Sequence, residues 1–481
     1  RVQLVLVGRK RAFERDSRGI KHVVDGQLVP RFLQALPFPL TGAQQRVIGE
    51  ISVDLAGPHP MHRLLQGDVG SGKTVVAVNA MLMAVQGKHQ GALMAPTEVL
   101  AEQHFVGVSR LLAGLQVPDP DNLFGDRPLR VELLTGRVTG EKRRAVLAEL
   151  AAGTIDIVIG THALIQEGVQ FNSLGVVVID EQHRFGVAQR AKLWEKALIP
   201  PHVLVMTATP IPRTLAMTAF GDLDYSVMDE LPPGRQVIKT VHRYETSRAS
   251  VMDFVKTEIV KGRQAYYVYP LIEESEKLSF EDLMQGYEQV KSFFPEPTYK
   301  ISMVHGRQKN IEKETNMKRF VTGDTQILVG TTVIEVGVNV PNASVMVIES
   351  AEKFGLSQLH QLRGRVGRGT EQSYCILLSS VKASRLAKDR LKIMCTTNDG
   401  FVIAEKDLEL RGPGDIDGTR QSGALNFKLA NIINDRANLE LAKEAAVAIC
   451  EKDPTLNLPE HQQTKLFLQT QKNKIGWGKI A

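Results

Sequence analysis

The chain has 481 residues, which exceeds one ordinary hydrophobic core and suggests two to four domains of roughly 100–200 residues each. Hydrophobic residues make up 43% and charged residues 23% of the sequence, and no run of about 18 uncharged apolar residues occurs. We therefore expect a cytosolic globular protein, not a membrane-spanning or exported one. The net charge of +6 is compatible with a polyanionic partner but does not require one. Cys375, Cys395 and Cys450 are too few and too scattered for a disulfide framework or a zinc site.

A glycine-rich stretch at residues 67–74 matches the pattern G-x-x-x-x-G-K-[ST] at every fixed position. We expect residues 61–66 to form the strand that enters this loop and residues 75–85 the helix that leaves it. In that setting backbone N–H groups and the helix N-terminus face the phosphates, Lys73 reaches the outer phosphates, and Thr74 can bind Mg²⁺. The pattern predicts a nucleoside triphosphate site made of Gly67, Asp68, Val69, Gly70, Ser71, Gly72, Lys73 and Thr74.

The region after this loop alternates between strand-like and helix-like patterns. The strand-like runs are residues 91–95, 156–160, 176–179 and 203–206. Continuous apolar runs separated by helices predict a parallel sheet that helices cover on both faces. Ligands of such sheets bind at the carboxyl ends of the strands. The polar clusters that follow the four runs begin at Pro96, Thr161, Asp180 and Thr207, so we expect them to converge on one cleft.

A turn-rich segment at residues 229–235 is typical of a hinge. A second set of strand-like runs follows it and predicts a second α/β domain without a phosphate loop. These runs are residues 265–269, 301–304, 327–329 and 345–348. Residues 381–400 have a helical pattern, residues 407–423 are rich in glycine and charge, and residues 429–451 form an amphipathic pattern before a basic tail.

The start of the chain offers little chemistry, and we expect residues 1–37 to be a linker. Because the first residue is Arg1 and not methionine, we expect an N-terminal part to be missing. Thr41 followed by Gln44 forms the capping-box pattern of a helix start. The sequence leaves open whether Gln44 only caps this helix or also contacts the nucleotide.

ATP hydrolysis needs Mg²⁺ near the phosphates, a group that activates water, and a cation for the charge that develops on the transferred group. Asp180 follows a strongly apolar run and suits the first task, and Glu181 beside it suits the second. The cation is expected from residues 358–369, where three arginines alternate with glycines. Since this stretch belongs to the second domain, the site would be complete only when the domains close.

The order of these clusters resembles that of superfamily-two helicases from about residue 38 to residue 369. The segments that carry this resemblance are Gly67–Thr74, Ala95–Glu98, Gly160–His162, Asp180–His183, Thr207–Thr209, Thr331–Val338 and Gln361–Arg368. Two longer strings, Ile179–Val187 and Met206–Ala216, are similar to those of the RecG branch-migration helicases and the transcription-repair coupling factor. The segment Asp407–Gly423 resembles the RecG version more closely, with Arg420 as the discriminating residue.

The resemblance implies two tandem RecA-like parallel-sheet α/β domains, a C-terminal translocation-motif segment and a helical tail. Residues that it assigns to ATP hydrolysis are Lys73, Asp180, Glu181, Arg365 and Arg368. It further assigns Gln44 to adenine, and Thr74 with Asp180 to Mg²⁺. Residues that it assigns to the DNA backbone or to coupling are Pro96, Thr97, Thr161, His183, Thr207, Thr209, Thr332, Arg411, Arg420 and Gln421.

The expected domains are a linker (1–37), an ATP-binding domain (38–234), a C-terminal helicase domain (235–400), a translocation-motif segment (401–425) and a helical basic tail (426–481). The implied function is ATP-dependent remodelling of branched and double-stranded DNA by a monomeric motor portion that lacks the family's N-terminal wedge domain. Single-stranded-DNA-binding protein is a candidate partner. Two alternatives remain, a translocase of the coupling-factor type and an ATP-dependent DNA clamp without turnover; the intact ATP-site residues disfavour the clamp.

Overall fold

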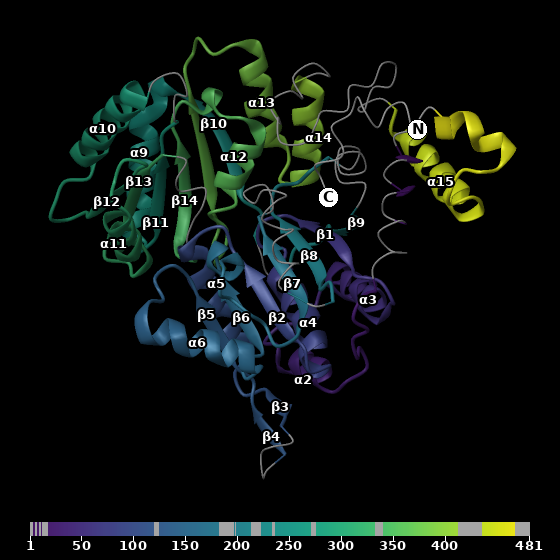
Figure 1. Cartoon of the computed structure of the whole chain (residues 1–481). Helices are drawn as coiled ribbons and strands as arrows, with labels where there is room; N and C mark the ends of the chain where they lie inside the picture. The colour runs from purple at the N-terminus through teal and green to yellow at the C-terminus, as the bar shows by residue number, and fades with distance from the viewer. Residues whose placement is uncertain are drawn as a thin grey trace. The chain divides into compact units, whose positions relative to one another are not determined.

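The computed structural model describes residues 3–4, 7–8, 11, 18–119, 125–181, 197, 199–212, 223–232, 236–270, 276–331, 340–411 and 435–466 (Figure 1). The chain forms two compact units. The first contains Arg1–Gly67, Ser71–Glu230 and Arg411–Ala481, and the second contains Leu231–Leu410 together with Asp68–Gly70. Within the described ranges, no helix has both the length and the apolar character needed to cross a bilayer.

The first unit is built on a seven-stranded parallel sheet in the order β5-β6-β2-β7-β8-β1-β9. Its strands are β1 (His62–Gly67), β2 (Gln90–Met94), β5 (Val131–Leu134), β6 (Ile157–Gly160), β7 (Leu174–Asp180), β8 (His202–Thr207) and β9 (Asp224–Met228). Alternate residues of a strand face opposite sides, as pleated geometry requires. In β7, for example, Val176 and Val178 pack in one apolar cluster and Val177 and Ile179 in the other.

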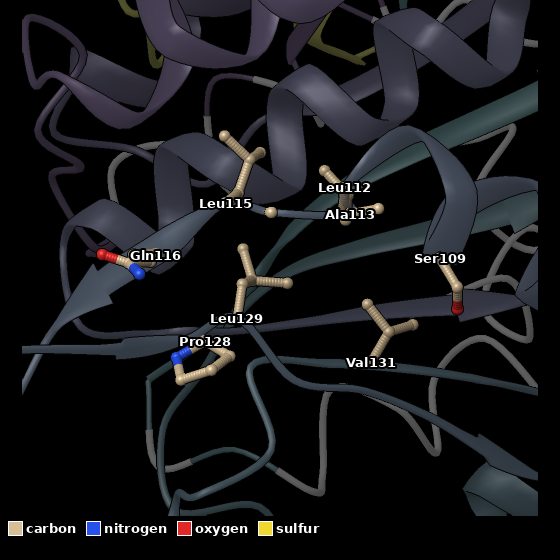
Figure 2. A pocket seen from close by; sticks show the side chains of 9 residues that line it. Ser109, Leu112, Ala113, Leu115, Gln116, Pro128, Leu129 and Val131 are labelled. Atoms are coloured by element: carbon tan, nitrogen blue, oxygen red, sulfur yellow. The ribbon is translucent and has the colours of Figure 1, made fainter.

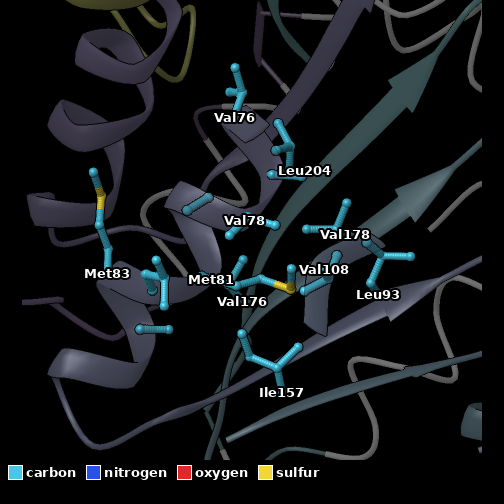
Figure 3. Packing of buried hydrophobic residues seen from close by; sticks show 14 of the residues in the cluster. Val76, Val78, Met81, Met83, Leu93, Val108, Ile157, Val176, Val178 and Leu204 are labelled. Atoms are coloured by element: carbon cyan, nitrogen blue, oxygen red, sulfur yellow. The ribbon is translucent and has the colours of Figure 1, made fainter. Parts of the chain in front are cut away.

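Helices cover both faces of this sheet. They are α2 (Leu28–Ala35), α3 (Gly42–Ala56), α4 (Lys73–Gln86), α5 (Glu98–Leu111) and α6 (Gly140–Ala152). Figure 3 shows Val76, Val78 and Met81 of α4 packed against side chains from β2, β6, β7 and β8. The side chains of α4 from Val75 to Val85 are all buried, which explains why its sequence is apolar on every side. This helix therefore holds the phosphate loop that precedes it against the sheet.

Helix α2 corrects our expectation that residues 1–37 are only a linker. Leu28, Val29 and Phe32 are buried on one side of this helix and belong to the same apolar cluster as α4. Their spacing places them on one helical face. This part of the segment is therefore a structural component of the first unit.

A small hairpin lies between α5 and β5 and has no counterpart among our sequence expectations. Strand β3 (Gln116–Pro118) pairs antiparallel with β4 (Asp126–Pro128). Figure 2 shows the pocket beside it, with a volume of about 290 Å³, lined by the end of α5 and by residues around the hairpin. This pocket lies away from the phosphate loop.

The second unit has its own parallel sheet in the order β10-β15-β14-β11-β13-β12. Its strands are β10 (Lys239–Tyr244), β11 (Gln264–Val268), β12 (Ile301–Val304), β13 (Ile327–Gly330), β14 (Ala343–Ile348) and β15 (Tyr374–Ser379). Its helices are α9 (Arg248–Val260), α10 (Glu276–Phe293), α11 (Asn310–Val321), α12 (Leu356–Arg363), α13 (Arg385–Thr396) and α14 (Gly400–Arg411). Buried clusters lie on the two faces of this sheet. The prediction of two parallel-sheet α/β domains is therefore confirmed.

The C-terminal region contains α15 (Arg436–Lys452), within the segment that the sequence predicts to be helical. Ala446 and Cys450 of this helix pack with Val7 near the start of the chain. The glycine-rich stretch that precedes α15 lies outside the described residues, apart from its beginning in α14.

Candidate functional site

The phosphate loop connects β1 to α4 and requires glycine at specific positions. Gly70 and Gly72 have φ values of 79° and 85°, a region that residues with a Cβ rarely adopt. A Cβ at Gly67 would lie 2.7 Å from Ser71 Oγ, and one at Gly72 would collide with the side-chain amide of Gln44. The close approach of these groups explains two of the fixed glycines of the motif.

Polar groups converge at the N-terminus of α4. Lys73 is the first residue of that helix, and its Nζ donates a 2.7 Å hydrogen bond to the carbonyl oxygen of Gly67. The hydroxyl of Ser71 is fully buried and has no hydrogen-bond partner in the described part of the chain. A cation, a buried hydroxyl and the positive end of a helix are together suited to phosphate oxygens.

Gln44 caps the start of α3, which is one of the two roles that the sequence left open for it. Its Oε1 accepts a hydrogen bond from the backbone N–H of Thr41, while its own N–H donates to Thr41 Oγ1, so the capping box is present. Its Nε2 also donates to the carbonyl oxygen of Ser71 at 3.2 Å. Gln44 thus ties the helix start to the phosphate loop, and its contact with adenine stays a prediction.

Asp180 ends β7, as the sequence predicts for a carboxylate at a strand terminus. Its Oδ2 lies 2.8 Å from Nε2 of His104 on α5. Burial of the carboxyl would raise its pKa, but the hydrogen bond and positive charge of His104 and the charge of Lys73 outweigh burial, so the pKa of Asp180 is lowered. Asp180 is therefore held as a carboxylate close to the phosphate loop.

Glu181 follows directly and adopts a backbone φ of 53°, which is rare for a residue with a long side chain. Such left-handed residues are found more often at functional sites, where the surrounding structure holds them in place. The turn directs the chain away from the end of β7 immediately after Asp180.

The predicted ligands Thr74 and Asp180 would offer oxygen atoms to Mg²⁺, which prefers one or two protein oxygens together with substrate phosphates. In the ranges that the structure describes, no group of three or more His, Cys, Asp or Glu side chains could hold a metal ion by itself.

The residues predicted to contact DNA or to couple hydrolysis to movement lie at neighbouring strand ends. Thr97 caps α5 after β2, and its Oγ1 accepts a hydrogen bond from Leu100 N–H at 3.3 Å. Thr161 follows β6, and its buried hydroxyl has no partner among the described residues. Thr207 and Thr209, after β8, share a 2.6 Å hydrogen bond between their hydroxyls.

The order of the strands determines where these residues lie relative to β7. Strands β6 and β2, which carry Thr161 and Pro96 with Thr97, lie on one side of β7. Strands β8 and β1, which carry Thr207 and the phosphate loop, lie on its other side. Asp180 therefore stands between the predicted DNA-contacting ends and the nucleotide-binding end.

The three arginines of residues 358–369 lie in the second unit, and their environments differ from one another. Arg363 is buried and donates hydrogen bonds to the carbonyl oxygens of Met394, Thr397 and Asn398 at 2.8–3.2 Å. It therefore anchors α12 inside the second unit. Arg368 donates through Nε to Gly364 O at 3.3 Å.

Arg365 and Arg368 also lie close enough to Tyr266 to affect its ionisation. Burial raises the pKa of Tyr266 to about 12, and the positive charges of Arg365 and Arg368 oppose this rise. Their role at a γ-phosphate stays a prediction.

Four predicted residues, His183, Thr332, Arg420 and Gln421, lie outside the described residues. Arg411 ends α14, and its side chain is likewise not described. The structure therefore leaves their assigned roles as predictions.

Two polar residues that the sequence did not identify contribute to the site. His104 contacts Asp180, and Gln66 at the end of β1 donates to the carbonyl oxygen of Ile211 at 3.0 Å, beyond Thr209. His104 lies 76 residues from its partner, and Gln66 lies 145 residues from Ile211. The sequence signal for Gln66 is its position directly before the phosphate loop, whereas His104 has no such signal.

Tandem parallel-sheet domains with a phosphate loop in the first are the architecture of superfamily-two helicases. Residues 41–218 match the family model for DEAD/DEAH box helicases, and residues 249–370 match that for the helicase conserved C-terminal domain. Residues 397–481 match the model described as ATP-dependent DNA helicase RecG, domain 3, C-terminal.

Individual relatives narrow this class. The chain is 52% identical over 456 residues to the ATP-dependent DNA helicase RecG of Synechocystis, 48% over 459 residues to that of Bacillus subtilis, and 50% over 443 residues to that of Escherichia coli K12. These alignments cover 95%, 95% and 91% of this chain, but only 53%, 65% and 61% of the relatives. The chain belongs to the RecG family of helicases and spans about half to two thirds of the length of these members.

Solved structures agree. A structure of RecG bound to a three-way DNA junction matches with a TM-score of 0.74 at 41% identity, and the match covers 91% of this chain and 56% of that one. Yeast Dbp5 bound to RNA and ADP BeF3 matches with a TM-score of 0.53 at 14% identity, over 88% of this chain and 97% of that one. The second match supports the fold alone.

Proposed function

We propose that this chain is a motor that couples ATP hydrolysis to movement on double-stranded DNA and thereby remodels branched DNA. The observation that carries the proposal is the convergence of Lys73, Ser71 and the carboxylate of Asp180 at one end of one sheet. The sequence identity of about 50% to RecG helicases is our reason for proposing branched DNA as the substrate of this ATP-driven motor. The match of residues 397–481 to a RecG model favours this reading over a coupling-factor translocase.

In this proposal the protein positions the phosphates and stabilises their charge, which is the main requirement of phosphoryl transfer. Lys73 and the loop N–H groups hold the outer phosphates, while Gln44 supports the loop and faces the adenine. Thr74 and Asp180 would hold Mg²⁺, which when bound neutralises phosphate charge. Glu181 orients and deprotonates the attacking water.

Arg365 and Arg368 supply the cations for charge that develops during hydrolysis. They belong to the second unit, whereas Lys73 and Asp180 belong to the first. We therefore propose that the site is completed only when the two units close on a nucleotide, so that hydrolysis drives a cycle of closure and opening.

DNA contacts would be made chiefly with the phosphate backbone, by groups such as Thr97, Thr161 and Thr332. Such contacts carry little base information, so affinity would depend on salt more than on base sequence. We propose a cytoplasmic location, by similarity to the bacterial RecG relatives, and a monomer as the active form. Single-stranded-DNA-binding protein stays a candidate partner.

A junction assay tests the proposal. The purified chain is mixed with a labelled three-way DNA junction, ATP and Mg²⁺, and strand release is followed with time. We expect ATP-dependent release that Lys73→Ala abolishes and that Lys142→Ala, an exposed lysine on α6, leaves intact. ATP turnover stimulated by the junction without any strand release would show that this chain alone is only an ATPase on DNA. No nucleotide binding at all would contradict the proposed site.

A further inference from the structure

Helix α5 connects two parts of the first unit to which the proposed function gives different tasks, DNA contact and ATP hydrolysis. It begins after Thr97, a predicted DNA-backbone contact, and carries His104 two turns further on. Nε2 of His104 lies 2.8 Å from Oδ2 of Asp180, the predicted Mg²⁺ carboxylate. One helix therefore has the DNA-facing strand end at its start and the ATP-site carboxylate against its side.

The helix is built to behave as a rigid element. Ala101 and Val108 are fully buried in the core, which fixes the rotation of α5 about its axis. On its outer side Glu98 and Glu102 both bind the guanidinium of Arg137, at 2.7 and 3.2 Å. Because both sides of α5 are held in this way, a displacement of its first turn would also displace His104.

The contact with Asp180 is shielded and specific. Both side chains are only 14% exposed, so water competes poorly for the hydrogen bond. Oδ2 accepts from His104, the backbone of Glu181 also hydrogen-bonds the carboxylate, and the charge of Lys73 in the phosphate loop lies close enough to act on it. Outer partners of this kind orient metal-binding groups, and their loss commonly reduces metal affinity or activity by about 10–100-fold.

We propose that His104 is a positioning residue that orients Asp180 for Mg²⁺–nucleotide, and that α5 uses this hydrogen bond to transmit DNA contact to the ATP site. The inference rests on the proposed function of the same site and adds a residue and a route that the family motifs do not include. The alternative is that His104 only satisfies a buried carboxylate and supports the fold.

Two variants of similar volume separate these readings. His104→Gln keeps an N–H donor at about the reach of Nε2, whereas His104→Leu removes it. Val106→Ala changes an exposed residue of the same helix and serves as the control. Thermal unfolding of each variant checks that the fold is retained; if His104→Leu does not fold, His104→Asn, whose donor falls short of Asp180, takes its place.

The first measurement is binding of fluorescent ADP with and without Mg²⁺. We expect His104→Leu to weaken the Mg²⁺-dependent part of the affinity about tenfold and to leave Mg²⁺-free binding unchanged, and His104→Gln to restore most of the loss. Equal Mg²⁺ dependence in wild type, His104→Leu and His104→Gln would overturn the inference. Absence of any Mg²⁺ effect in the wild type would instead contradict the proposed ATP site.

The second measurement is the factor by which duplex DNA stimulates ATP turnover. A coupling of ordinary strength changes such a factor about 5-fold or more, so we expect at least this reduction in His104→Leu and near-normal stimulation in His104→Gln and Val106→Ala. A uniform fall in basal and stimulated rates, with their ratio unchanged, would refute transmission through α5 and leave only the positioning of Asp180.

Discussion

At the scale of single residues, Glu181 offers the sharpest test of the proposed chemistry. Its φ of 53° fixes the turn after β7, so a substitution must preserve the backbone while it removes the carboxylate. Glu181→Gln meets this condition because glutamine has almost the same shape. If Glu181 deprotonates water, the variant should bind nucleotide normally and lose about 10³-fold or more in ATP turnover.

Steady-state ATPase rates with saturating DNA, together with nucleotide affinity, check this prediction. Glu167→Gln alters an exposed carboxylate in the same unit and should change neither quantity. Turnover by Glu181→Gln within a few-fold of wild type would assign the general base to another group.

At the scale of elements, α2 should contribute to the stability of the first unit although it lies in a segment that looks like a linker. Phe32 is fully buried in the cluster that also holds α4. Truncation of a core phenylalanine leaves a cavity, so Phe32→Ala should reduce the free energy of unfolding by about 3–5 kcal/mol. Equilibrium chemical unfolding measures this change, and the exposed neighbour Gln34→Ala should stay within about 0.5 kcal/mol of wild type. Equal stability of the two variants would mean that α2 does not pack on α4.

Three histidines cluster in the first unit at the end of the sheet away from the predicted ATP site. We expect this cluster to lower the stability of the unit at acidic pH. The ring of His22 lies 5.1 Å from that of His89 and 4.9 Å from that of His202. Burial, together with positive charge on His202 and His89, lowers the pKa of His22 to about 3. The unfolded chain binds a proton near pH 6.5 and the folded chain does not, so stability is present above that pH and is lost as the pH falls below it.

For His22 alone, this linkage amounts to about 2 kcal/mol between pH 7 and pH 5. His22→Leu should therefore flatten the decline in unfolding free energy over this range by a similar amount, measured by chemical unfolding at several pH values. His59→Gln removes an exposed histidine and should leave the decline unchanged. A decline that persists in full in His22→Leu would assign the acid sensitivity to other groups.

The sequence predicts elements well where one short pattern determines them. Strands β2, β7 and β8 are largely apolar runs because helices cover both faces of the sheet, and β1 directly precedes the phosphate loop, so all four could be located to within a residue or two. Strands β9 and β10 lie at sheet edges and carry polar residues, so their patterns did not stand out. The phosphate loop was predictable because its chemistry requires adjacent residues. The hydrogen bond between His104 and Asp180 was not, because it depends on how α5 packs on the sheet.

At the scale of the whole molecule, the two units have separate sheets and separate apolar cores. Each can therefore move as a body without disrupting its own packing. Lys73 and Asp180 lie in one unit and Arg365 and Arg368 in the other, so the proposed hydrolysis cycle draws on residues of both units. The proposed motor also needs a segment that links ATP hydrolysis to displacement of DNA.

We expect Arg420 and Gln421 to belong to that converting segment. They lie in a stretch with glycines at positions 412, 414, 418 and 423, between α14 and α15 and separate in sequence from the ATP-site motifs. If this stretch transmits closure to DNA, Arg420→Ala or Gln421→Ala should keep DNA-stimulated ATP turnover within about two-fold while strand displacement falls at least tenfold. Both activities are measured on the same preparation, with the exposed Glu444→Ala on α15 as the control. Parallel losses of turnover and displacement would place the two residues in the ATP site, because a coupling residue alters only the link between them. If strand displacement is unchanged in both variants, the stretch is only a linker between α14 and α15.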